Sequence, residues 1–172
     1  MDWQEYLTQV DQASASCSGP ELELFFKEAL HNCRKEYGVR SLEYASLLKK
    51  LGEYYDQREQ LERAEGCFQE VQSLLAWATG TQCLEYGAAL NRLANIHRRL
   101  KRYEEAEWEL SASLDLYRRT VGERHPLFAC GLEELSRVYL ERGRPARAAE
   151  LRLQAEEIFS ALPREGAALA VS

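Results

Sequence analysis

The residues in this sequence that could do chemistry are neighbouring carboxylates and a histidine. Glu104 and Glu105, and again Glu133 and Glu134, place carboxylates side by side, as a general acid–base pair would, and His97 could carry a proton near neutral pH. Both carboxylate pairs fall in charge-rich helical stretches, where such residues commonly face solvent or a helix N-terminus. We therefore predict no catalytic residue and no enzymatic activity.

The sequence motifs of cofactor and metal enzymes are also missing. The chain has no GxGxxG or GxxxxGK[ST] phosphate-binding loop, no HExxH zinc motif and no GxSxG nucleophile turn. Its five cysteines form no CxxC pair, and no histidine completes a zinc-site spacing with them. Odd, scattered cysteines are typical of reduced, mostly buried thiols. We expect no metal, no cofactor and a reducing intracellular compartment: the cytoplasm, with the nucleus left open.

Charge and hydropathy argue against two classes of partner. The 172 residues carry a net charge of −6, whereas nucleic-acid binders usually present a basic surface. No stretch approaches the roughly 20 apolar residues that span a bilayer. The first residues have neither the basic segment nor the apolar segment of a secretory signal. We expect neither nucleic acid nor membrane as a partner.

One run of basic residues has two interpretations. Arg98, Arg99, Lys101 and Arg102 fall where a predicted helix ends. Basic side chains at the C-terminal end of a helix are stabilised by the helix dipole, by a few tenths of a kcal/mol up to about 1 kcal/mol. The same cluster could instead bind phosphate or an acidic segment of a partner. The sequence leaves both interpretations open.

The elements that must position these residues recur every 42 residues. Leu-Glu-Tyr occurs at residues 42–44 and again at 84–86. The same offset relates glycines, leucines, alanines, small residues and ring-bearing residues in three copies: Gly38, Gly80 and Gly122; Leu48, Leu90 and Leu132; Leu51, Leu93 and Leu135; Ala64, Ala106 and Ala148; Gly52, Ala94 and Ser136; Tyr55, His97 and Tyr139. Such a period indicates stacked structural units.

Each unit is predicted to be a pair of helices. In the middle unit, apolar residues recur at helical spacing from Leu90 to Leu100 and again from Tyr103 to Tyr117, on either side of a short polar turn. Gly122 is placed to end the second helix, and proline at 126 to begin the next. The small residues would let the two helices approach closely. In the last unit Arg152 replaces an apolar residue, which predicts a capping hairpin with a partly solvated outer face.

These residues resemble the tetratricopeptide repeat family. The pattern Leu48-x-x-Leu51-Gly52-x-x-Tyr55 followed by Ala64-x-x-x-Phe68 is similar to the repeat signature, and the 42-residue period resembles the kinesin-light-chain type. The resemblance covers roughly residues 41 to 162. It implies an all-α fold, a right-handed superhelical solenoid of about four helix hairpins, or eight helices.

The period also divides the chain. We predict one helical domain over residues 1–162, made of a degenerate N-terminal hairpin over 1–40 and three repeat units over 41–80, 81–122 and 123–162. The first hairpin would contain helices over residues 2–14 and 21–37. Residues 163–172 are predicted to be a flexible C-terminal tail.

The resemblance further implies a concave groove lined by the first helix of each unit. Carried over by position, the groove residues would be Lys49, Glu53, Asn91, Arg92, Asn95, Arg98, Glu133 and Arg137. Asparagine can hydrogen-bond a peptide backbone and arginine a carboxylate. The centre of the groove is thus basic, which suits an acidic peptide, although the same residues could be ordinary solvated side chains. The chaperone-tail clamp of the family is not matched, because Glu53 stands where asparagine is needed.

We therefore expect a non-catalytic adaptor or scaffold that binds a partner protein through this groove. Two alternatives are a structural subunit that packs through its ends or convex face, anchored by Trp77 and Trp108, and a regulatory subunit of a partner enzyme. The sequence indicates neither the partner nor the oligomeric state.

Overall fold

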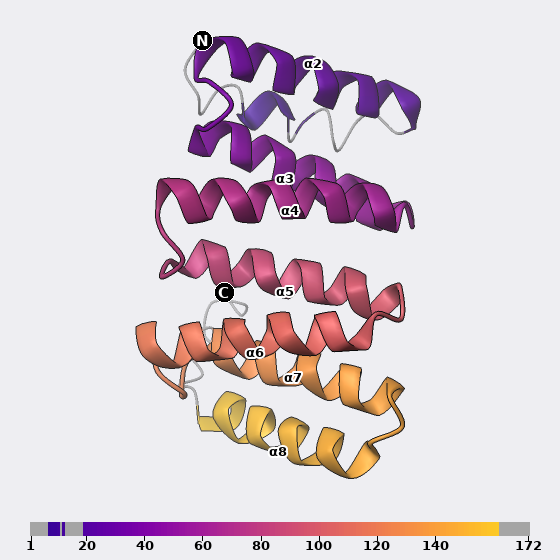
Figure 1. Cartoon of the computed structure of the whole chain (residues 1–172), viewed down its shortest axis with the longest axis vertical. Helices are drawn as coiled ribbons and strands as arrows, with labels where there is room; N and C mark the ends of the chain where they lie inside the picture. Colours follow the sequence, from indigo (N-terminus) through magenta and orange to yellow (C-terminus); the bar gives the residue numbers. More distant parts are fainter. Residues whose placement is uncertain (1–6, 11, 13–18, 162–172) are drawn as a thin grey trace, which may run out of the picture.

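The helices of this protein stack in sequence order along one long axis (Figure 1). A computed structural model describes residues 7–10, 12 and 19–161, and within these ranges it contains no β-strand. The helices are α2 (Pro20–Glu36), α3 (Leu42–Gln57), α4 (Leu61–Ala78), α5 (Leu84–Arg99), α6 (Tyr103–Thr120), α7 (Pro126–Glu141) and α8 (Pro145–Ala161). The predicted all-α repeat solenoid is confirmed. Most of the predicted helix over residues 2–14, and the tail over 163–172, lie outside the described residues.

The 42-residue period sets where the helices begin. Helices α3, α5 and α7 start at residues 42, 84 and 126, and helices α4, α6 and α8 start at residues 61, 103 and 145. Each turn between hairpins passes through a glycine with positive φ, 86° at Gly38, 78° at Gly80 and 87° at Gly122. A side chain is disfavoured in that conformation, so the repeated glycines mark the ends of the units.

Small residues bring the two helices of a hairpin together, as predicted. Ala64, Ala106 and Ala148 are buried on the second helix of each pair. Opposite them, a Cβ atom added at Gly52 would lie 3.0 Å from the Phe68 ring, so there is no room for a larger residue. In the last hairpin the Ser136 hydroxyl donates to the Ala148 carbonyl at 2.9 Å, so its buried polar atom is satisfied.

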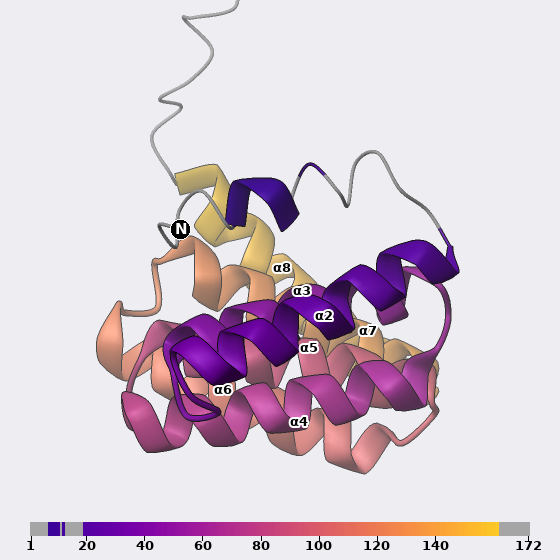
Figure 2. The ribbon, with the colours of Figure 1, turned by 90° about the horizontal axis from the view of Figure 1, so that it is seen from above.

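Hairpins α3–α4, α5–α6 and α7–α8 then stack into a continuous core. Leu93 and Ile96 of α5 pack with residues of α2, α3 and α4, whereas Ala94 of the same helix packs with α6, α7 and α8. The helix axes rotate from α2 to α8 when the stack is seen from above (Figure 2). At the last hairpin Arg152 is 71% exposed and pairs with Glu156, so the outer face of α8 is solvated as predicted.

Candidate protein-binding groove

The first helix of each hairpin is positioned by a side-chain cap at an equivalent residue. The Ser41 hydroxyl accepts from the backbone N–H of Tyr44 at 3.0 Å, and the Cys83 sulfur accepts from the N–H of residue 86 at 3.3 Å. His125 Nδ1 accepts from the N–H of Leu127 at 3.2 Å. These caps satisfy otherwise unpaired amide groups and fix where α3, α5 and α7 begin. The faces of these helices are thereby held in register.

A groove of about 470 Å³ lies between α3 and α5, with α4 beneath it. Its floor is apolar and comes from Phe68, Val71 and Leu75. Its walls come from the faces that α3 and α5 turn towards it, and they carry Leu42, Ala45, Ser46, Lys49, Glu85, Ala88, Ala89 and Arg92. An open cleft with an apolar floor and a few charged rim groups is suited to a ligand that offers an apolar side chain.

Two of the predicted groove residues line this cleft. Lys49 on α3 is exposed, and Arg92 on α5 lies 3.4 Å from Glu53, so the cleft rim joins both helices. The apolar floor and Glu85 are not among the residues predicted from the sequence. The floor residues belong to the predicted core stripe of α4, and a stripe alone does not show which of its members remain open to a cleft.

The other predicted residues follow the same face towards α7 but outside this cleft. Asn95 Nδ2 donates to Glu134 at 3.4 Å, and Arg137 donates to the same carboxylate at 2.6 Å. Glu133 is half-buried. The Asn91 Oδ1 atom is buried and accepts no hydrogen bond from the described part of the chain. On this part of the surface, Asn95 and Arg137 are therefore bound to Glu134 within the protein.

The basic run at the end of α5 is paired with the neighbouring hairpins. Arg98 donates to Glu141 of α7, Arg99 to Asp56 and Glu59, and Arg102 to Glu65: three arginines and four carboxylates. The partners are 37 to 43 residues apart, close to one repeat. These arginines therefore join hairpins, a role that neither interpretation of the sequence contained.

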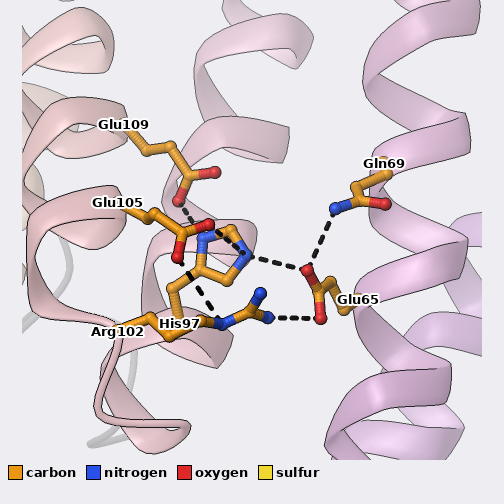
Figure 3. Close-up of polar contacts among 6 residues, drawn as sticks. All are labelled: Glu65, Gln69, His97, Arg102, Glu105 and Glu109. Carbon is orange, nitrogen blue, oxygen red and sulfur yellow. Dashed lines mark hydrogen bonds and ion pairs between the residues drawn. The ribbon is translucent and has the colours of Figure 1, made fainter.

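A buried polar cluster lies at the joint between α4 and the α5–α6 hairpin (Figure 3). His97, 3% exposed, takes the packing position predicted for it. Its Nδ1 atom lies 2.9 Å from Glu109 Oε2, and its Nε2 atom lies 3.1 Å from Glu65 Oε1. Burial raises the pKa of Glu109 to about 7, against the opposing effect of the nearby imidazole. By contrast, hydrogen bonds from Arg102 and His97 outweigh burial and lower the pKa of Glu65.

Two indoles stand apart from the core. Trp77 near the end of α4 is 62% exposed and Trp108 on α6 is 66% exposed, so neither packs in the solenoid. The Arg40 guanidinium lies 5.3 Å from the centre of the Trp77 ring, in cation–π contact.

A second cleft, of about 560 Å³, is lined by residues of α6, α7 and α8 and the turn between α6 and α7.

Within residues 7–10, 12 and 19–161, no three His, Cys, Asp or Glu side chains are grouped so that they could hold a metal ion. No described helix is long and apolar enough to cross a membrane.

Comparisons with known proteins agree with this architecture. Residues 85–161 match the sequence model of the tetratricopeptide repeat family. No curated protein matches the chain. Among solved structures, BtubC (BKLC) from P. vanneervenii superposes with a TM-score of 0.73 at 20% identity, over 96% of this chain and 65% of that one. The chain thus spans about two thirds of the length of that protein.

A Podosopora anserina protein, provisionally described as a kinesin light chain with nearly identical TPR-like repeats, has a TM-score of 0.63 at 16% identity. The match covers 92% of this chain and 85% of that one, and a point variant of the same protein gives a TM-score of 0.66. At these identities the likeness concerns the fold. Repeats of this kind generally mediate protein–protein interaction. The match over residues 85–161 and the shared fold together support assignment of the chain to the tetratricopeptide repeat family.

Proposed function

We propose that this protein is a non-catalytic adaptor or scaffold that holds a segment of a partner protein in the groove between α3 and α5. The observation that carries the proposal is the cleft of about 470 Å³, which the half-exposed side chain of Leu42 lines together with the buried residues Phe68, Val71 and Leu75. Apolar side chains of this size are usually covered in a stacked core. A partner's apolar side chain placed in the cleft would cover Leu42.

The charges on the rim indicate the partner's chemistry. Lys49 is exposed and makes no ion pair with any described residue, and Arg92 reaches Glu53 only at 3.4 Å. Two cations beside an apolar floor favour a peptide or helix that places an acidic residue next to an apolar one. Glu85, near the start of the α5 wall that also carries Arg92, would repel a second acidic residue there. A cytoplasmic location and a role as a complex subunit are parts of the same proposal.

A peptide library tests this function without knowledge of the natural partner. Random 12-residue peptides are displayed and selected on the protein, and the affinities of enriched peptides are measured by calorimetry. We expect enriched sequences to contain an apolar residue beside Asp or Glu. Ala88 is exposed on the groove wall, so Ala88→Trp fills the cleft and should weaken binding at least tenfold, about 1.4 kcal/mol.

The matched control is Ala149→Trp, the same substitution at an exposed alanine of α8 outside the groove. It should leave peptide affinity unchanged. If both variants weaken peptide affinity equally, or if neither weakens it, the peptide does not bind in the groove.

A second candidate function is favoured by the exposed indoles. Trp108 is 66% exposed and lies away from the groove on α6, so it could anchor the protein in a larger assembly. Trp108→Glu would then abolish assembly and leave the affinity for groove peptides intact. Loss of peptide affinity in that variant would argue against two separate surfaces.

A further inference from the structure

The hydrogen bonds of His97 to Glu109 and Glu65 require one more proton than a neutral imidazole and two ionised carboxylates contain. A neutral imidazole has one N–H and one lone pair, and an ionised carboxylate can only accept. His97 nevertheless has a carboxylate within hydrogen-bond distance of each nitrogen, at 2.9 Å and 3.1 Å. With both carboxylates ionised and the ring neutral, one contact would set an oxygen lone pair against a nitrogen lone pair. In a buried site that contact is unfavourable.

The surrounding charges decide where the extra proton resides. Glu65 of α4 accepts from Arg102 at the start of α6, and from Gln69 at 3.0 Å, so it stays ionised. Glu105 of α6 lies farther from the ring, 3.9 Å from Nε2, and its side chain is 53% exposed. The Glu109 side chain is buried, and its hydrogen bond within the described chain is to His97. The additional proton therefore belongs to the His97–Glu109 pair.

We propose that the joint between hairpins α3–α4 and α5–α6 is a proton-dependent contact, closed while His97 and Glu109 share a proton and loosened when that proton leaves. Without it the ring has a single N–H, which can serve either Glu65 or Glu109. The buried Glu109 carboxylate has the greater need of a donor, because Arg102 already serves Glu65. The contact from His97 to Glu65, which crosses between the hairpins, is then lost.

The joint between hairpins α5–α6 and α7–α8 has a tyrosine at the position that His97 takes in the preceding joint. Tyr139 stands one repeat after His97, and its hydroxyl donates to Glu107, which stands one repeat after Glu65. A tyrosine brings its own proton to such a contact at all pH values below its high pKa, which burial and Glu107 raise further. The positions equivalent to Glu109 in the other two repeats are Cys67 and Leu151, which are not carboxylates. Only the joint around His97 is therefore expected to respond near neutral pH.

The direction of the pH effect follows from the Glu109 carboxyl. Its pKa of about 7 in the folded protein exceeds the ordinary glutamate value of about 4.3, so the folded state binds the extra proton between these values. Stability from this source is fully present below the ordinary pKa and is lost as pH rises through about 7. The groove spans this joint, because its floor residue Phe68 belongs to hairpin α3–α4 and its wall residue Ala88 belongs to hairpin α5–α6. Loosening would therefore alter its width.

Thermal unfolding of the full chain at pH 6 and pH 8 tests the proposal. In Glu109→Gln the amide donates to His97 permanently, and all other titrating groups are unchanged. We expect the melting temperature of the natural protein to fall by about 4 °C more than that of Glu109→Gln between these pH values. The double variant His97→Tyr, Glu109→Leu copies the neighbouring repeats and should behave as Glu109→Gln does. An equal fall in all three proteins would overturn the proposal.

A second test, by NMR, uses the natural sequence and so does not depend on whether a variant folds. In protein labelled with ¹³C at the glutamate carboxyl carbons, the Glu109 signal should titrate close to neutral pH. A midpoint near the ordinary value of about 4.3 would overturn the proposal. Neither experiment uses a partner, so their outcome is independent of whether the groove binds peptides.

Discussion

At the scale of the residue, the turn inside each hairpin passes through the left-handed backbone region at one position. Glu59, Lys101 and Gly143 occupy it one repeat apart, with φ of 59°, 62° and 75°. A side chain in this conformation costs roughly 1–2 kcal/mol, and glycine avoids that cost. The first two hairpins therefore carry local strain that the third does not.

We predict that Lys101→Gly stabilises the protein by about 0.5–1 kcal/mol. The relief of strain exceeds the greater freedom that glycine gives the unfolded chain. Urea unfolding followed by circular dichroism measures the change. The reverse substitution, Gly143→Ala, should destabilise by about 1 kcal/mol. Destabilisation by Lys101→Gly would mean that the turn does not hold this conformation in solution.

At the scale of the element, helices within a hairpin are matched in side-chain size. A Cβ atom added at Gly87 of α5 would lie 2.7 Å from the ring of Tyr117 on α6. The equivalent positions in the other hairpins, residues 45 and 129, are alanines. Glycine is thus used where the facing residue is a fully buried tyrosine. The pair of sizes, more than either residue alone, sets the separation of the helices.

Two glycine substitutions separate packing from helix propensity. Gly87→Ala should destabilise by about 1–3 kcal/mol, because the added methyl group overlaps the Tyr117 ring in a closed core. Gly66→Ala on α4 has open space around the new atom and should stabilise by about 0.5–1 kcal/mol through helix propensity. Both are read from urea unfolding midpoints. The same sign for both variants would contradict the packing between α5 and α6.

Contacts between hairpins were harder to predict than the hairpins themselves. The helix starts follow from the 42-residue period, because each unit repeats the same apolar spacing, turn and cap. The pairing of Arg99 with Asp56 does not follow, because it depends on how one hairpin is rotated on the next. The buried Glu109 left one signal in the sequence: it stands where the other repeats have Cys67 and Leu151. A charged residue at an apolar repeat position indicates a buried partner.

At the scale of the whole molecule, the stack presents two surfaces of different character. The groove between α3 and α5 combines an apolar floor of buried side chains with the charged rim residues Lys49 and Arg92. The exposed indoles of Trp77 on α4 and Trp108 on α6 do not line this cleft, and Trp108 stands on a helix that contributes nothing to it. The sequence predicted Lys49 and Arg92 as groove residues by their position in the repeat. It did not predict that Asn95 and Arg98 would be engaged with α7, since those contacts arise from stacking.

The most direct test of groove binding is to map a library-selected peptide onto the ¹⁵N-labelled protein by NMR. The central claim predicts shifts in the backbone amides of α3 and α5 that flank the cleft, near Lys49 and Ala88, while the indole N–H signal of Trp108 stays in place. Movement of the Trp108 indole signal with unchanged α3 and α5 amides would contradict it and place the binding surface on α6.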